Sequence, residues 1–100
     1  MFTGTVADVD DLSVQFEEGG QVLVEELDKQ ILSKGAWATV IFKYREANRR
    51  TGEMGKVKFT IRRYQKRNGA YLQKSKFNIS SIKQAIGIRE ALDRWIAEGE

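Results

Sequence analysis

The Asn68-Gly69 pair constrains the fold of this chain more than any other feature of its sequence. It joins two stretches, 56–66 and 70–79, in which apolar and polar residues alternate. Both residues of the pair accept a positive φ, and such a pair between alternating stretches is the strongest short-range signal for a β-hairpin. Alternation in a strand over 56–66 separates apolar from basic side chains. The two sets are Val57, Phe59 and Ile61 on one face, and Lys56, Lys58, Thr60, Arg62 and Tyr64 on the other. We therefore predict a sheet with one apolar and one basic face.

Two further stretches extend this prediction. The strand after the turn divides in the same way, with Tyr71, Phe77 and Ile79 on one parity and Lys74, Lys76 and Asn78 on the other. Residues 36–46 are rich in β-branched and aromatic residues and predict another strand. The face of that strand with Trp37, Lys43 and Arg45 is the more cationic, so we expect it on the same side of the sheet as Arg62.

The charges are segregated along the chain. The net charge is +3. Residues 1–30 hold eight acidic residues and one lysine, whereas residues 31–79 hold thirteen basic and two acidic residues. Positive charge concentrated in the predicted strands points to a phosphate-bearing partner.

Several function classes are not expected. The chain has no cysteine and no histidine. Their absence removes thiol nucleophiles, the commonest general base and the commonest metal ligands, so we predict neither an enzyme nor a cofactor. No apolar stretch is long enough to span a membrane and no signal peptide is visible. We expect a cytoplasmic protein, associated with the nucleoid, or lying in the host cytoplasm if the protein is viral.

Two segments near the N-terminus are harder to interpret. Residues 1–20 predict an acidic N-terminal arm or an extra hairpin outside the main core. A sharper alternative places this arm over the basic face, where it would compete with ligand. Residues 21–35 combine helix-favouring residues such as Glu25 and Glu26 with strand-favouring residues such as Val22 and Val24.

Residues 80–98 predict a helix. Ser81 and Gln84 fit a capping box at its start. The apolar stripe of this helix holds Ile82, Ala85, Ile88, Leu92, Trp95 and Ile96. We expect the stripe to cover the apolar face of the sheet and part of it to pair with a second copy of the helix.

The basic face is the candidate binding site. Phosphate contacts give salt-dependent affinity, and exposed rings allow bases to stack. The candidate residues are Trp37, Lys43, Arg45, Lys56, Lys58, Arg62, Tyr64, Lys66, Lys74 and Lys76. The simpler interpretation is that the charged side chains of this face are only solvated and bind no ligand. Trp37 is equally compatible with a core or dimer contact, Tyr71 is expected in the core, and Arg63 and Arg67 have the wrong parity for this face.

The sequence also resembles a known family. The relevant features are G-K-V-K-F-T-I-R-R-Y at 55–64, G-A-Y after the turn, K-x-K before F-N-I-S, and the C-terminal amphipathic helix. Together they resemble the single-stranded-DNA-binding domain of the positive cofactor four family of transcriptional coactivators, and more closely its bacterial and phage relatives. The resemblance covers about residues 22–98.

This resemblance implies a four-stranded antiparallel sheet followed by one helix, with two copies pairing through their helices to form grooves for single strands. It also implies a first strand over 21–32. The groove lysine of the family falls on Lys56, its strand arginine on Arg62, and its later basic pair on Lys74 and Lys76. Gln65 departs from the family, since the coactivators carry tryptophan there. Base stacking must then fall to Tyr64, Trp37 or another ring.

We predict an α+β fold, with a curved antiparallel sheet of four strands or slightly more followed by one C-terminal amphipathic helix. Residues 1–20 form the arm, and residues 21–100 form a domain that binds single-stranded DNA, with RNA left open, as a homodimer and without sequence specificity. The alternative is a protein-interaction module of a nucleic-acid-processing assembly, with the arm or the loop at Arg49 and Arg50 as its contact.

Overall fold

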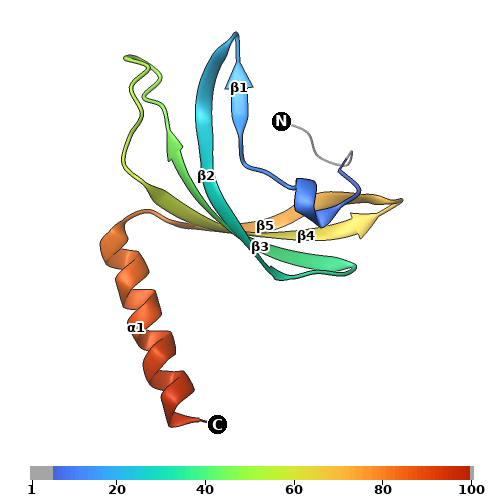
Figure 1. The fold of residues 1–100 in the computed structure, drawn as a ribbon, viewed down its shortest axis with the longest axis vertical. Coiled ribbons are helices and arrows are strands. Elements are labelled where there is room, and N and C mark those ends of the chain that lie inside the picture. The colour runs from blue at the N-terminus through green and yellow to red at the C-terminus, as the bar shows by residue number, and fades with distance from the viewer. Residues whose placement is uncertain (1–5, 100) are drawn as a thin grey trace.

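The structure, a computed structural model, describes residues 6–99. A short 3₁₀ helix, Val9–Asp11, precedes one curled antiparallel sheet, which is followed by one α-helix (Figure 1). The strands lie side by side in chain order. They are β1 (Phe16–Glu18), β2 (Gln21–Ser33), β3 (Trp37–Glu46), β4 (Lys58–Arg67) and β5 (Ala70–Ile79), and the helix is α1 (Ile82–Glu98). The predicted fold class is confirmed, with a sheet one strand larger than the family resemblance implies. Residues 1–5 of the arm and residue 100 of the predicted domain lie outside the described residues.

The turn between β4 and β5 is the predicted one. Asn68 has a φ of 52° and Gly69 a φ of 80°. Positive φ at both central residues gives a backbone twist that matches the right-handed twist of the flanking strands. The hairpin at this pair is therefore confirmed.

The ambiguous segment at 21–35 forms the longest strand, β2, with 13 residues. Its pairing with β3 is interrupted between Glu26 and Asp28 and again between Ile31 and Ser33. Such irregularities bend a strand and increase its twist, and Figure 1 shows β2 bending through the middle of the sheet. The two halves of the sheet thereby curl around one concave face, on which the core sits.

The core lies on the concave face and includes part of the N-terminal arm. Alternate residues of β3 are fully or nearly buried there, and they pack with two tyrosines from the β4–β5 hairpin. From the arm, Val9, Leu12 and Val14 complete the cluster. The β3 and hairpin members are Ala38, Val40, Phe42, Tyr44, Tyr64 and Tyr71. The expectation that the arm lies outside the main core is therefore wrong for these three residues.

Two polar side chains of β2 hold the arm in place. The Glu26 carboxylate accepts hydrogen bonds from Ser13 Oγ at 2.7 Å and from the Val14 amide at 3.2 Å. Lys29 Nζ donates to the Leu12 carbonyl oxygen at 2.6 Å and also to that of Asp10. These contacts satisfy backbone groups of a segment that has only a short strand of its own.

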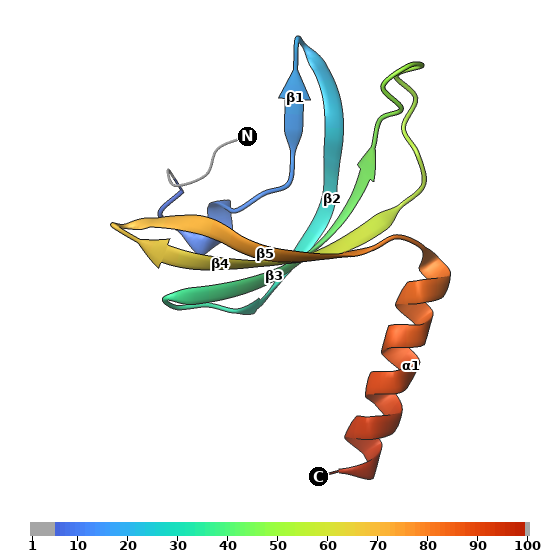
Figure 2. The same ribbon diagram turned by 180° about the vertical axis from the view of Figure 1, so that it is seen from behind.

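Helix α1 begins at the predicted cap but stands away from the sheet. Ser81 Oγ accepts from the Gln84 amide at 3.1 Å, and Gln84 Oε1 accepts from the Ser80 amide at 2.9 Å. The helix then runs away from the end of β5, on the side of the sheet opposite the arm (Figure 2). In the described chain none of its residues is buried. Its apolar stripe therefore does not close over the sheet as predicted.

Candidate nucleic-acid interface

Arg62 lies at the centre of the candidate interface and is positioned by neutral groups. Its Nε donates to Thr60 Oγ1 at 3.1 Å, and one terminal nitrogen donates to Gln73 Oε1 at 2.8 Å. Thr60 Oγ1 donates in turn to Asn78 Oδ1 at 2.7 Å. Among residues 6–99, Arg62 has no carboxylate within ion-pair distance. Its guanidinium is therefore oriented while its charge stays uncompensated.

Two lysines extend this charge on the concave face. Lys76 pairs with Arg62 across β4 and β5, is exposed, and forms no ion pair within the described chain. Lys58 lies two residues from Thr60 along β4 and contacts Glu46 at 3.1 Å. Both partners of that contact are more than a third exposed, so it is weak and a phosphate can replace the carboxylate. We call Lys58, Arg62 and Lys76 the basic strip.

Three of the predicted site residues lie on the other face. β3 and β4 pair Val40 with Arg62 and Phe42 with Thr60, so even-numbered residues of both strands share the concave face. Trp37, Lys43 and Arg45 therefore lie on the convex face, and their predicted placement beside Arg62 is wrong. The Arg45 guanidinium is paired there with the Glu25 carboxylate.

A register shift in β5 explains a second error. Arg63 pairs with Ser75 and Tyr64 with Gln73, which leaves Lys74 as an extra residue. An extra residue of this kind moves the side chain of each residue beyond it in the strand to the opposite face of the sheet from the one that simple alternation predicts. Tyr71 consequently lies on the concave face, whereas Phe77 and Ile79 lie on the convex face, and the prediction that these three share a face is wrong.

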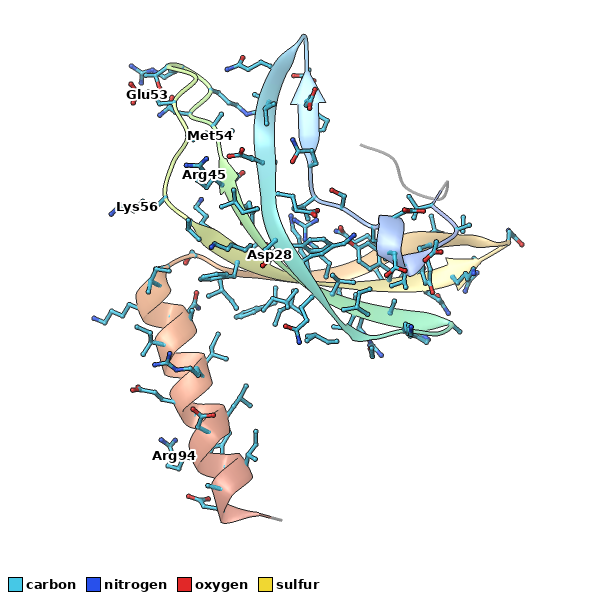
Figure 3. The ribbon with its side chains drawn as sticks, viewed as in Figure 1. Asp28, Arg45, Glu53, Met54, Lys56 and Arg94 are labelled. Carbon is cyan, nitrogen blue, oxygen red and sulfur yellow. The ribbon has the colours of Figure 1, made fainter. Side chains whose placement is uncertain are left out.

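The remaining predicted cations lie around the basic strip. Lys74 is exposed at the irregularity, and Figure 3 shows Lys56 pointing outward from the connection before β4. The Lys66 ammonium lies 5.4 Å from the centre of the Tyr71 ring.

Neither ring proposed for stacking is available beside the basic strip. Tyr64 is 5% exposed and belongs to the core, as does Tyr71, whose assignment to the core is confirmed. Burial raises the pKa of Tyr64 to about 12, so its hydroxyl stays protonated at neutral pH. Trp37 lies on the convex face, where the Arg63 guanidinium stacks 4.5 Å from the ring centre. The guanidinium contact is a cation–π interaction and accounts for both side chains without a ligand.

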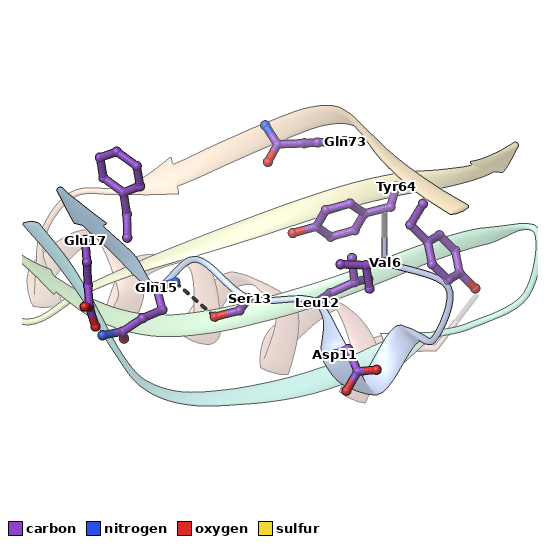
Figure 4. Close-up of a pocket in the computed structure, with 10 residues that line it drawn as sticks. Val6, Asp11, Leu12, Ser13, Gln15, Glu17, Tyr64 and Gln73 are labelled. Atoms are coloured by element: carbon purple, nitrogen blue, oxygen red, sulfur yellow. Dashed lines mark hydrogen bonds between the residues drawn. The ribbon is translucent and has the colours of Figure 1, made fainter. Parts of the chain in front are cut away.

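The structure contains a hollow of about 430 Å³ between the arm and the β4–β5 hairpin (Figure 4). Sequence reasoning missed it because most of its wall comes from the arm. Its lining residues are Val6, Asp11, Leu12, Ser13, Gln15, Phe16, Glu17, Tyr64, Tyr71 and Gln73.

A second, more apolar groove of about 640 Å³ separates α1 from the convex face of the sheet. Apolar side chains line both of its walls, and several on the helix side are largely exposed, including Leu92 at 49% and Ile96 at 74%. The sheet wall is formed by Leu32, Ile41, Phe59, Ile61 and Ile79.

Residues 6–99 contain no group of three or more acidic, histidine or cysteine side chains that could hold a metal ion. α1 falls short of the length and apolar character required to cross a membrane. Comparisons of the chain with family models, curated proteins and solved structures found no match.

Proposed function

We propose that this protein binds single-stranded DNA along the basic strip, without reading a defined sequence, and that it does so as a homodimer. The observation that carries the proposal is the Arg62–Lys76 pair on the open part of the concave face, with Arg62 oriented entirely by neutral partners. The resemblance of residues 55–64 to the positive cofactor four family supports the same function.

The chemistry of the strip suits phosphate. A guanidinium fixed at Nε and at one terminal nitrogen retains donors for an anionic oxygen and loses little side-chain freedom on binding. Contacts to phosphates position a nucleic acid but carry no sequence information. A single strand can follow a concave surface, whereas duplex DNA is stiff over about 150 base pairs. The strip therefore favours single strands.

The homodimer is supported by the groove between α1 and the sheet. Apolar patches of this kind on a monomer mark interaction sites. Both walls of the groove are apolar, so the same surface on a second chain is self-complementary, as a two-fold dimer requires. The α1 of a partner chain would cover side chains such as Leu92 and Ile96.

The function is tested by fluorescence anisotropy of labelled single strands, with unlabelled duplex as competitor. With about three cations engaged per protomer, log K should fall with log[salt] with a slope of about −2. Arg62→Ala should weaken binding about ten-fold or more for all sequences. Arg63→Ala, one residue along on the convex face, is the matched control and should bind as the parent does.

Equal effects of the two arginine variants, or affinity independent of salt, would contradict the proposed interface. Binding weaker than about 10⁻⁴ M would favour the protein-interaction module instead.

The dimer is tested separately by sedimentation equilibrium. Leu92→Asp places a charge in the groove and should yield monomers whose circular dichroism is unchanged. Lys83→Asp does not touch the groove lining and should remain dimeric. A monomeric parent protein would refute the dimer.

A further inference from the structure

The hollow beside the arm adjoins the basic strip. Gln73 lines the hollow and also accepts the hydrogen bond from Arg62. A single DNA strand with a phosphate bound to Arg62 would therefore have a neighbouring base within reach of the hollow. Figure 4 shows Tyr64 and Gln73 on the hairpin side, facing Leu12 and Ser13 on the arm side.

The walls of the hollow suit a flat ring. Phe16 is only half-buried and contributes an accessible ring, while the largely buried Leu12, Tyr64 and Tyr71 close the hollow with apolar surface. Its volume of about 430 Å³ falls in the lower part of the usual range for small-molecule pockets, about 300–1,000 Å³. The hollow is therefore large enough for one nucleobase, and its walls are largely apolar.

The polar groups around the hollow suit a base better than a phosphate. Gln15 and Gln73 are each held through Oε1, by the Glu26 amide and by Arg62, which leaves their Nε2 groups without an acceptor among residues 6–99. Asp11 and Glu17 add carboxylates, which accept hydrogen bonds from amino groups and repel phosphate.

We propose that this hollow receives one unstacked base from the bound strand and prefers an amino-bearing base such as cytosine to thymine. Asp11 and Glu17 lie at opposite ends of the hollow (Figure 4). Cytosine presents an amino group where thymine presents a carbonyl oxygen, so a carboxylate at either end accepts from the first and repels the second. The inference rests on the proposed function and adds a bias in base composition to a backbone-binding strip.

The test compares oligo-dC with oligo-dT of equal length, about 15 nucleotides, by anisotropy at one salt concentration. The parent protein should bind oligo-dC about five-fold or more tightly than oligo-dT. The double variant Asp11→Asn with Glu17→Gln should lose this preference, while its affinity for oligo-dT rises because two negative charges are gone. The matched control, Asp10→Asn with Glu18→Gln, removes two neighbouring charges that do not line the hollow and should keep the preference.

Equal binding of the two oligonucleotides by the parent protein would overturn the base site and leave the strip intact. A preference that survives in the Asp11 and Glu17 variant would also overturn it. Binding of neither oligonucleotide would overturn the proposed function together with the base site.

Discussion

Replacing Leu12 by alanine tests whether the N-terminal arm belongs to the folding core. Leu12 is 4% exposed and belongs to the core cluster on the concave face, together with Phe42 and Tyr64. Truncating a buried leucine to alanine costs about 2–5 kcal/mol, and a segment at the edge of the core can partly collapse into the space, so we expect about 2–3 kcal/mol. A domain of this size has a free energy of unfolding of about 5–15 kcal/mol, of which this loss is a large part.

The measurement is urea unfolding followed by circular dichroism, together with the melting temperature. The midpoint should fall at an unchanged slope, and the melting temperature should drop by about 10 °C or more. Leu27→Ala is the matched control, since Leu27 lies on β2 and is 38% exposed. This control substitution should lower the free energy of unfolding by about 1 kcal/mol or less. Equal midpoints for the two variants would refute the inclusion of the arm in the core.

Three further predictions concern stability. Burial raises the pKa of Tyr64 to about 12 from an unfolded value of about 10, so stability should be full below pH 10 and fall as pH rises toward 12. Tyr64→Phe should flatten that fall in a pH series of thermal melts, and an unchanged series would contradict this. Gly69→Ala forces a side chain into a φ of 80° and should cost about 1–2 kcal/mol in urea unfolding, whereas a gain would contradict the turn geometry. Glu26→Ala removes the acceptor for Ser13 and for the partly buried Val14 amide and should cost about 1–3 kcal/mol, whereas Glu26→Gln should restore most of that loss.

The elements that sequence predicts well are those specified by neighbouring residues. The Asn68-Gly69 turn needs only two residues that tolerate positive φ. The start of α1 needs only Ser81 and Gln84, which bond across one turn of the chain. Such signals do not depend on the rest of the fold.

The faces of β3 could not be predicted in this way. Apolar side chains occur on both of its faces, Phe42 on one and Ile41 on the other, so alternation alone does not say which is buried. Residues 47–57 join β3 to β4 and leave the register to tertiary packing. The cationic character of Lys43 and Arg45 predicted the wrong face for them. The arm, and not the helix, packs on Phe42, so the even-numbered residues of β3 are buried on the concave face and Lys43 and Arg45 lie on the other one.

The binding site was predicted only in part for related reasons. Lys58, Arg62 and Lys76 do share one face, as their parity on each strand suggested. The irregularity at Lys74 has no local signal, since the extra residue is defined only by the pairing partner. The hollow depends on contacts between the arm and Glu26, which are distant in sequence.

The way α1 stands off its own sheet links folding to protein concentration in the proposed dimer. Much of the apolar surface of the helix is then covered only when two chains meet. Because only folded chains associate, the association stabilises the folded state. The temperature of half-unfolding should rise with total chain concentration, and dilution should fray the helix before it loosens the curled sheet.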